Sequence, residues 1–463
     1  MSEAIRRGQV FRYDSFTVEA ERGLLTCSYS LDGRAFSERV ALAPGPRWHT
    51  PAARAAARLI FLLAGVSYYK TAAPPVIDLG GTPVTAPEQA FLRDFYLQGL
   101  AEYEYRNSLD LSDLRIAGGV ESPAPVDTEA RPAGPPAREV RALVPFGGGI
   151  DSIVTVEHVR RRADVALFVV SRPGDRFDAI ERPAAVSGLP VLRAEREIDP
   201  QLLRSADLGF LNGHVPVTGI LSAIAVLCAV LNDHDFVVMS NEWSSSVPTL
   251  EHRGRLINHQ YSKSESFEAG FRGVLAAADG GLPDYFSLLR PRTELWVADK
   301  FAAVKQYHDT FRSCNRAFHI DKSLRLDHWC GHCDKCCFID LILAPFLPAA
   351  ELERIFAGGD LPPAPGSREP LGDPAQADRF RALLATSADA KPFECVGEVN
   401  ECRAAALLAA RRPDRADCKL LQELAAEVAA LPDAPSAAAS AAMLRPVGEH
   451  FIPAAFATED LLA

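Results

Sequence analysis

Residues 143–159 read LVPFGGGIDSIVTVEHV: an apolar run, three glycines, an Asp-Ser pair and then apolar residues at every third position from Ile153 to Val159. This order predicts a strand, a glycine loop and a helix. Glycines let backbone N–H groups approach phosphate oxygens, and a helix N-terminus adds partial positive charge. The residues expected to bind a phosphate chain are Gly147, Gly148 and Gly149.

The Asp-Ser pair that follows the glycines adds chemistry to the loop. We expect Asp151 to bind Mg²⁺ directly or through water, and the Ser152 hydroxyl to donate to a phosphate oxygen. The loop is not a Walker loop, because no Gly-Lys-Ser/Thr follows, and it lacks the GxGxxG spacing of a dinucleotide fold. A glycine turn that only permits tight packing is the structural alternative. The Asp-Ser pair between strand and helix favours nucleotide binding.

Short apolar runs separated by helical stretches lie on both sides of this loop, at residues 141–146, 163–171, 190–194 and 235–239. That alternation is typical of a parallel α/β sheet, which we place within residues 139–350. In such sheets ligands bind at the carboxyl ends of the strands. The sequence therefore predicts an α/β nucleotide-binding domain whose site lies at the loops that follow these runs.

Two of those loops carry polar residues. SNEWSSS, residues 240–246, follows the last apolar run, and Ser171 ends the second run. We expect hydroxyl and amide groups here to bind phosphate or ribose, and Glu242 to hold Mg²⁺; an ordinary polar turn is the alternative. The candidates for nucleotide binding in these loops are Ser171, Asn241, Glu242 and Ser244.

The remaining chain divides by composition. Residues 10–42 alternate as in a small antiparallel sheet, and residues 52–65 and 88–105 have helical spacing, which predicts an α+β domain over residues 1–116. Residues 117–138, rich in Pro and Gly, are expected to form a flexible linker. Residues 351–463 are expected to form a helical C-terminal region.

Four cysteines have the spacing of a metal site. WCGHCDKCC, residues 329–337, contains three cysteines at two-residue spacing, and FRSCN lies upstream. Four thiolates suit a closed, structural Zn²⁺ site. His332 could replace one sulfur and Cys337 is a spare; an iron–sulfur cluster is disfavoured because the remaining spacing does not match and no proline follows. The expected zinc ligands are Cys314, Cys330, Cys333 and Cys336.

Bulk properties limit the partners of the 463-residue chain. A formal charge of −11 and a pI of about 5.6 argue against a broad basic surface and therefore against nucleic acid as a partner. The longest apolar stretch, from Gly219 to Leu231, is shorter than the roughly 20 residues that span a bilayer. The N-terminus has no apolar signal core. We expect a cytoplasmic protein without a membrane partner.

Several polar residues are candidates for catalysis, although no motif assigns them. The run NHQYSKS, residues 258–264, and the string SYYK, residues 67–70, could face a cleft; a solvated loop and a core position are the respective alternatives. Arg290 and Arg292 are further cationic candidates, with a surface salt bridge as the alternative. The proton-transfer and substrate-binding candidates are Lys70, His259, Lys263 and Cys395, although a single cysteine is more often buried and structural.

The glycine loop resembles SGGxDS, the pyrophosphate-binding loop of the PP-loop ATP pyrophosphatases, with Gly147 where that family usually has Ser. The cysteine pattern is similar to the zinc knuckle of 7-cyano-7-deazaguanine synthase, another PP-loop enzyme. Further strings resemble the MurL-type epimerases as far as about Cys402: AGVSYYKTAAPP, YRNSLDL, NGHVPVTGI, SNEWSSS, NHQYSKS, LRPRTELWVADKFA and KPFECVGE.

The resemblance to the MurL-type epimerases implies a reaction. That family inverts the terminal L-Glu of UDP-MurNAc-L-Ala-L-Glu, a peptidoglycan precursor, to D-Glu with ATP and Mg²⁺, and releases AMP and pyrophosphate. It implies as a functional partner a ligase that adds L-Glu to UDP-MurNAc-L-Ala. An amide- or nitrile-forming ligase would share the adenylation step but needs an amine or ammonia. A non-catalytic nucleotide-binding protein would release no pyrophosphate.

Overall fold

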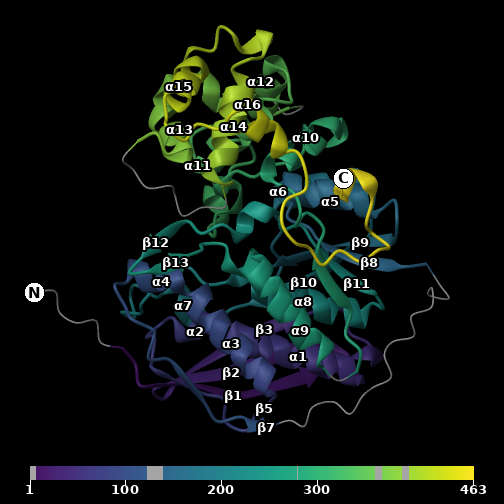
Figure 1. The fold of residues 1–463 in the computed structure, drawn as a ribbon. Coiled ribbons are helices and arrows are strands. Elements are labelled where there is room, and N and C mark those ends of the chain that lie inside the picture. Colours follow the sequence, from purple (N-terminus) through teal and green to yellow (C-terminus); the bar gives the residue numbers. More distant parts are fainter. Residues whose placement is uncertain (1–6, 122–138, 279, 360–367, 388–395, 463) are drawn as a thin grey trace, which may run out of the picture.

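The computed structural model describes residues 7–121, 139–278, 280–359, 368–387 and 396–462. Ten strands form one mixed sheet in the order β14-β11-β8-β9-β10-β3-β2-β1-β4-β6. Helices cover both faces of its parallel half (Figure 1). The predicted α/β class, with a sheet rich in parallel pairs, is confirmed.

Five strands make the parallel half of the sheet. The predicted runs fold as β8 (Arg141–Pro145), β9 (Asp164–Ser171), β10 (Val191–Glu197) and β11 (Phe236–Met239), and β14 (Asp284–Ser287) is added at the edge. All of their mutual pairings are parallel. Chain order along the sheet reverses beside β8, whose neighbours are β9 and β11. Such a reversal opens a crevice at the carboxyl ends of the two central strands.

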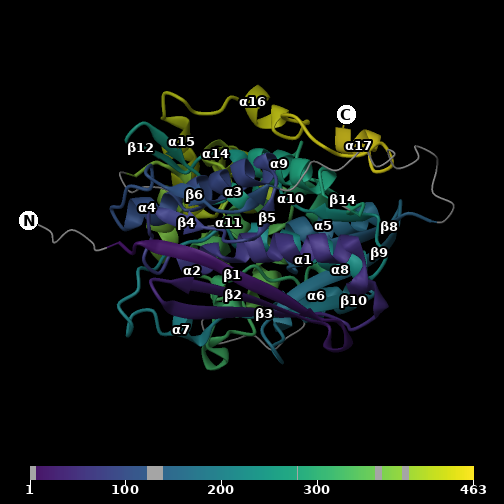
Figure 2. The ribbon, with the colours of Figure 1, turned by 90° about the horizontal axis from the view of Figure 1, so that it is seen from below.

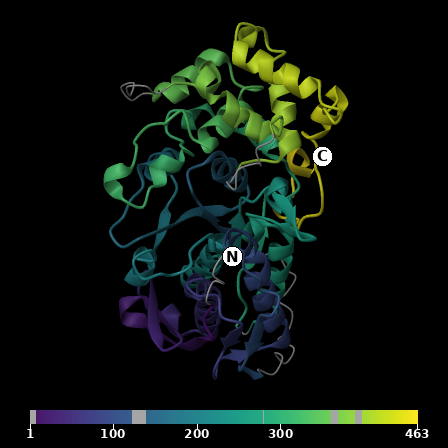
Figure 3. The same ribbon diagram turned by 90° about the vertical axis from the view of Figure 1, so that its left-hand side faces the viewer.

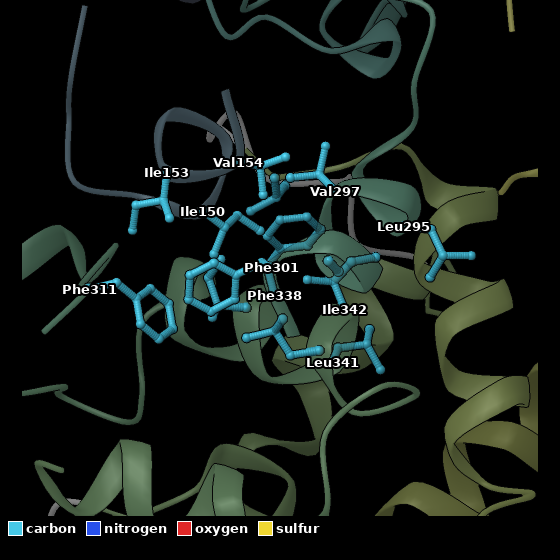
Figure 4. Close-up of a cluster of buried hydrophobic side chains, with 14 of the residues drawn as sticks. Ile150, Ile153, Val154, Leu295, Val297, Phe301, Phe311, Phe338, Leu341 and Ile342 are labelled. Carbon is cyan, nitrogen blue, oxygen red and sulfur yellow. The ribbon is translucent and has the colours of Figure 1, made fainter. Parts of the chain in front are cut away.

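Side chains on these strands alternate between two cores, as the period of two requires. Val144 and Val238 enter one core, and their neighbours Leu143 and Val237 enter the other. Helices α5 (Ile150–Val159), α6 (Asp178–Ser187) and α10 (Glu294–Ala303) pack in the first core. Figure 4 shows α5 meeting α10 there through Ile150, Val154 and Val297. Helices α8 (Val217–Leu231) and α9 (Glu265–Ala276) pack in the second.

The N-terminal part contributes the other five strands. The predicted antiparallel sheet is confirmed as β1 (Val10–Glu19), β2 (Leu24–Leu31) and β3 (Arg34–Ala41), seen in Figure 2, beside the short parallel strands β4 (Val76–Asp78) and β6 (Arg115–Ala117). β3 pairs antiparallel with β10, so this sheet continues into the parallel half. Its helices are α1 (Pro51–Ala64), α2 (Val66–Tyr69), α3 (Ala86–Gly99) and α4 (Ala101–Arg106).

Residues before and after the predicted linker share the sheet and the second core. α1 packs on α8, and both lie in the second core. Within residues 117–138, Ala117 ends β6 and Val120–Glu121 forms β7, which pairs with β5 (Pro83–Val84); residues 122–138 lie outside the described residues. Whether residues 1–116 and 139–350 are separate folding units therefore stays a prediction.

Helices gather at the end of the molecule opposite β1–β3 (Figures 1 and 3). Most of them share the first core with α5 and α10 and so are packed onto the sheet domain: α11 (Asp334–Leu343), α12 (Ala349–Ala357), α13 (Ala377–Leu384), α14 (Val399–Ala409) and α15 (Lys419–Ala429). α16 (Ala437–Ala442) packs on α14, whereas the short α17 (Glu459–Leu462) lies beside α5. In the part of the chain that the structure describes, none of the helices is long and apolar enough to cross a membrane.

Candidate functional site

A cavity of about 470 Å³ lies where the loops after β8 and β11 meet. The switch in strand order therefore coincides with a real hollow. The predicted nucleotide-binding residues Gly147, Gly149, Asp151, Ser152 and Asn241 line it. Ser152 donates to the Gly149 carbonyl at 3.0 Å, and Asn241 donates to the Ser287 hydroxyl of β14 at 3.1 Å. The loop and the strand ends are thus tied together at the cavity wall.

The three glycines of the loop have different reasons to be glycine. Gly148 has a φ of 75°, and a Cβ there would collide with the Ala179 carbonyl oxygen of α6. Gly149 is the N-cap of α5, so that the helix N-terminus faces the cavity. Gly147 is exposed, and a Cβ there would meet nothing within 4 Å. This position therefore has room for a larger side chain such as serine.

Carboxylates gather at the start of α5. Asp151, Glu242 and Glu294 each offer an oxygen within 4.8 Å of the others. Glu294 is buried, and its Oε2 has no hydrogen-bond partner. Burial and the charges of Asp151 and Glu242 hold the pKa of Glu294 well above its usual range. A hard divalent cation with oxygen ligands would relieve this repulsion, so the cluster fits Mg²⁺.

A fourth carboxylate stands behind the first three. Glu401 of α14 is buried; its Oε2 accepts from the Leu295 backbone N–H at 3.2 Å, and its Oε1 has no partner. Burial and the charge of Glu242 raise the pKa of Glu401 to about 8. The acidic cluster therefore extends from the sheet domain to the C-terminal helices.

Three cations line the same cavity: Lys263, Arg312 and Lys335. Arg312 is buried, and burial lowers its pKa. Its Nη1 is 3.5 Å from Asp178 Oδ2, whereas its Nε has no partner. A buried guanidinium with a spare donor, next to a loop of backbone N–H groups, is suited to a phosphate oxygen.

The four predicted zinc ligands come together. Their sulfurs lie within 4.8 Å of one another, with Cys333 Sγ 3.5 Å and Cys330 Sγ 3.7 Å from Cys336 Sγ. Tetrahedral zinc with 2.3 Å bonds to sulfur separates sulfurs by about 3.8 Å, so the cluster could bind zinc. His332 Nδ1 lies 2.5 Å from the Cys330 carbonyl oxygen, and Cys337 is buried in the first core. Neither is part of the cluster.

A second group of titratable side chains includes a residue from the loop that carries Lys263. Glu102, His214 and His259 offer ligand atoms within 4.8 Å of one another. His259 Nδ1 is 2.5 Å from Glu102 Oε2, and the rings of His214 and His259 are 4.3 Å apart. Lys70 donates to Asn212 Oδ1 at 2.7 Å and to the Gly213 carbonyl at 3.1 Å, beside His214.

Comparison with known proteins now identifies the family. A model described as the MurL N-terminal domain matches residues 2–288, and one described as the MurL C-terminal domain matches residues 310–439. The chain belongs to the MurL family. The resemblance seen in the sequence is thereby confirmed. No solved structure matches the MurL-family chain.

Three curated relatives carry the name UDP-N-acetyl-alpha-D-muramoyl-L-alanyl-L-glutamate epimerase. The protein of Salinispora tropica is 39% identical over 98% of this chain and 96% of its own length. That of a Micromonospora species is 40% identical over 98% of each chain. That of Xanthomonas oryzae pv. oryzae is 40% identical over 87% of this chain and 86% of its own.

Other predicted residues of this MurL-family chain lie away from the cavity wall. Ser171 is buried at the end of β9, outside the cavity lining, and Ser244 donates to Glu242 Oε1 at 3.2 Å, which orients that carboxylate. Gly148 is outside the cavity lining and lies against the Ala179 carbonyl of α6. Cys395 lies outside the described residues, so its role stays a prediction.

The expectation that Arg290 and Arg292 form a surface salt bridge or face a substrate is wrong, because both are buried structural residues. Arg290 pairs with Glu268 at 2.9 Å and donates to the Glu242 carbonyl at 3.0 Å and the Lys263 carbonyl at 2.6 Å. It therefore joins the two loops that carry these site residues. Arg292 donates to backbone carbonyls of residues 444, 460 and 461 and so fastens the C-terminal segment.

Sequence reasoning missed Glu102, Glu294, Arg312, Lys335 and Glu401. Two of these had a signal: Arg312 lies two residues before Cys314, and Lys335 lies between Cys333 and Cys336. Because the cysteines are held together, the residues next to them in the sequence are also held in place. The three glutamates sit in helices with no local motif, and only tertiary packing brings them to the site.

Proposed function

We propose that this protein inverts the terminal L-Glu of UDP-MurNAc-L-Ala-L-Glu to D-Glu in an ATP-dependent reaction that releases AMP and pyrophosphate. The supporting observation is the cavity at the strand switch, around which a glycine loop, a carboxylate cluster and three cations lie. The three relatives named as epimerases of this compound supply the substrate. A ligase that adds L-Glu to UDP-MurNAc-L-Ala would precede it in the same reaction sequence.

ATP explains how a poorly acidic Cα–H could be exchanged. A free α-carboxylate opposes loss of the neighbouring proton, because its negative charge destabilises the carbanion. Attack of the carboxylate oxygen on the α-phosphate forms an acyl-adenylate and expels pyrophosphate. The acyl-adenylate carbonyl can accept the electron pair as an enolate. Reprotonation on the other face and hydrolysis of the adenylate by water then give D-Glu and AMP.

In this proposal the described residues around the cavity bind the phosphates, balance their charge or hold the metal ions. The backbone of Gly147–Gly149 and the α5 N-terminus bind the pyrophosphate unit, and the Ser152 hydroxyl turns from the Gly149 carbonyl to donate to it. Lys263, Arg312 and Lys335 balance its charge. Asp151, Glu242 and Glu294 would hold Mg²⁺, which when bound neutralises phosphate charge. Asn241 contacts the nucleotide, and Cys314, Cys330, Cys333 and Cys336 would hold a structural Zn²⁺.

The test incubates the protein with ATP, Mg²⁺ and UDP-MurNAc-L-Ala-L-Glu and measures AMP, pyrophosphate and the configuration of glutamate after hydrolysis. AMP and D-Glu should both appear, and each should require ATP. Asp151→Asn should abolish both while circular dichroism stays unchanged. Inversion without ATP would contradict the proposal. AMP formation that yields an amide in the presence of ammonia, with no D-Glu, would indicate the ligase instead.

A further inference from the structure

The group formed by Glu102, His214 and His259 has the features of a proton-transfer site. The His259 and Glu102 side chains are 13% and 5% exposed, so their 2.5 Å contact is largely shielded from water. The other Glu102 oxygen, Oε1, accepts from Arg106 Nε at 2.6 Å. Glu102 is therefore held on both oxygens, and its contact with Nδ1 fixes the tautomer and the orientation of the His259 ring.

The charges around this pair favour an ionised carboxylate and a neutral second histidine. Burial opposes ionisation of Glu102, but the hydrogen bond and charge of His259 and the hydrogen bond from Arg106 outweigh it, so the pKa of Glu102 lies below the usual range. Burial and the charge of His259 lower the pKa of His214 to about 4. A neutral His214 can pack against His259 without repelling its charged form. Two lysines, Lys70 and Lys263, also act on His214.

The pair is connected to the nucleotide cavity through short pieces of backbone. His259 and Lys263 belong to the same loop, and Lys263 lines the cavity. That loop is hydrogen-bonded to the loop of Glu242: Asn258 donates to the Ser245 carbonyl at 2.9 Å, and the Ser245 hydroxyl donates to the Lys263 carbonyl at 3.0 Å. His259 is thus four residues along the same hydrogen-bonded loop from Lys263, which lines the cavity.

Resting on the proposed function, we propose that His259, oriented by Glu102, takes the Cα proton from one face of the adenylated glutamyl unit and that Lys70 serves the opposite face. The Cα–H bond breaks, an N–H bond forms on the imidazole, and the electron pair enters the activated carbonyl as an enolate. The Lys70 ammonium then gives a proton to Cα, which leaves a neutral amine. Proton exchange with water resets both groups.

The state of Lys70 suits this role. Burial lowers its pKa from 10.5 to about 8, so both of its protonation states are accessible near neutral pH. In the reverse direction the Lys70 amine is the base and the His259 imidazolium is the acid. Glu102 is then a positioning residue, and His259 and Lys70 are the two catalytic residues.

The test is isotope exchange in D₂O, starting separately from the L-Glu and the D-Glu forms of the substrate with ATP and Mg²⁺. His259→Gln and Lys70→Met should each slow inversion by about 10²–10⁴-fold. Both should still form AMP. His259→Gln should lose exchange at Cα of one diastereomer and keep it with the other, and Lys70→Met should show the opposite pattern. His252→Gln, on the exposed hairpin seven residues before His259, is the matched control.

Glu102 is tested by pH. The carboxylate stabilises the imidazolium, so Glu102→Gln should move the acidic limb of kcat/KM to lower pH, and Glu102→Asp should restore part of the rate. A purely structural role would move neither limb. The groups around His259 that also shape the profile are Arg106, His214, Lys70 and Lys263.

Three results would overturn the assignment if AMP formation stays normal. In the first, His259→Gln exchanges the Cα proton of both diastereomers as the wild type does; in the second, His259→Gln and Lys70→Met lose Cα exchange with the same diastereomer. In the third, Glu102→Gln leaves the pH profile of kcat/KM unshifted. A metal equivalent that is present in the wild type and missing from His259→Gln would make the histidines ligands and would also overturn it. Absence of AMP from the wild type would instead refute the proposed function.

Discussion

At the scale of single residues, the glycine loop makes opposite predictions for neighbouring positions. Gly148→Ala should destabilise the protein by about 2 kcal/mol or more, because an L side chain at positive φ is strained and its Cβ meets the Ala179 carbonyl. Gly147→Ser should change stability by no more than about 0.5 kcal/mol, since the space is open. Chemical denaturation measures both. Equal losses would contradict the loop conformation.

Glu294 should matter for metal binding more than for folding. Glu294→Gln removes a carboxyl whose ionisation is opposed by burial and by the charges of Asp151 and Glu242, so the metal-free protein no longer has to protonate it on folding and should become more stable. The Mg²⁺ concentration that supports half-maximal AMP formation should rise by about 10–100-fold. Glu449→Gln, at an exposed position, is the control. An unchanged Mg²⁺ requirement would remove Glu294 from the metal site.

Lys70 should make the free energy of unfolding depend on pH in the alkaline range. Its folded pKa of about 8 lies below the unfolded value of 10.5, so the unfolded state binds more protons between these values. Stability should therefore rise with pH from about 8 to 10.5 relative to a Lys70→Met variant, in which this gain is absent. Melting temperatures across that range, with exposed Lys419→Met as the control, measure it. Parallel curves for wild type and Lys70→Met would refute it.

The sequence anticipated site residues where the chemistry is local. Asp151 and Ser152 follow the glycines directly, and Glu242 follows a strand, so each has a nearby signal. Glu294 and Glu102 have none, because their roles depend on which helix end lies against which loop. His259 was anticipated as a polar residue, but its carboxylate partner lies 157 positions away in the sequence.

At the scale of elements, the cysteine cluster and the cavity share residues of one short segment. Arg312 and Lys335 line the cavity and flank the cysteines, so loss of metal should misplace both cations. Cys333→Ser, or removal of zinc by a chelator, should weaken ATP binding by about tenfold or more, as for disturbed supporting residues in other sites. Calorimetric titration with ATP, combined with zinc analysis, measures this. Cys418→Ser, outside the cluster, should keep both zinc and affinity.

Most strands were predictable and some were not. β8, β9 and β11 are apolar on both faces, because each face is covered by helices, and such runs stand out in a sequence. β14 is four residues long and begins with Asp284, so it gave no comparable signal. The pairing of β3 with β10 joins residues more than 150 positions apart, and local patterns contain no information about it.

At the scale of the whole molecule, the second core predicts that residues 139–463 alone will not fold. Leu143, Phe168 and Val237 pack in a core shared with α1, and β10 pairs with β3. Removing residues 1–138 would expose that face and an unpaired strand edge, a combination that promotes aggregation. Gel filtration and circular dichroism of the fragment measure this. A monomeric fragment that unfolds cooperatively would show that the two parts are independent.

The hydrogen-bonded passage from β3 to β10 has a consequence for how substrates are chosen. Because one hydrogen-bonded sheet continues across both halves, we expect entry and exit to depend on loop movement rather than on closure of two lobes. The distance between the glycine loop and the His214 and His259 rings is then fixed. Under the proposed function, the length of the bound peptide would therefore decide which of its carbon atoms reaches these rings. Compounds one residue shorter or longer should bind yet present the wrong carbon for inversion.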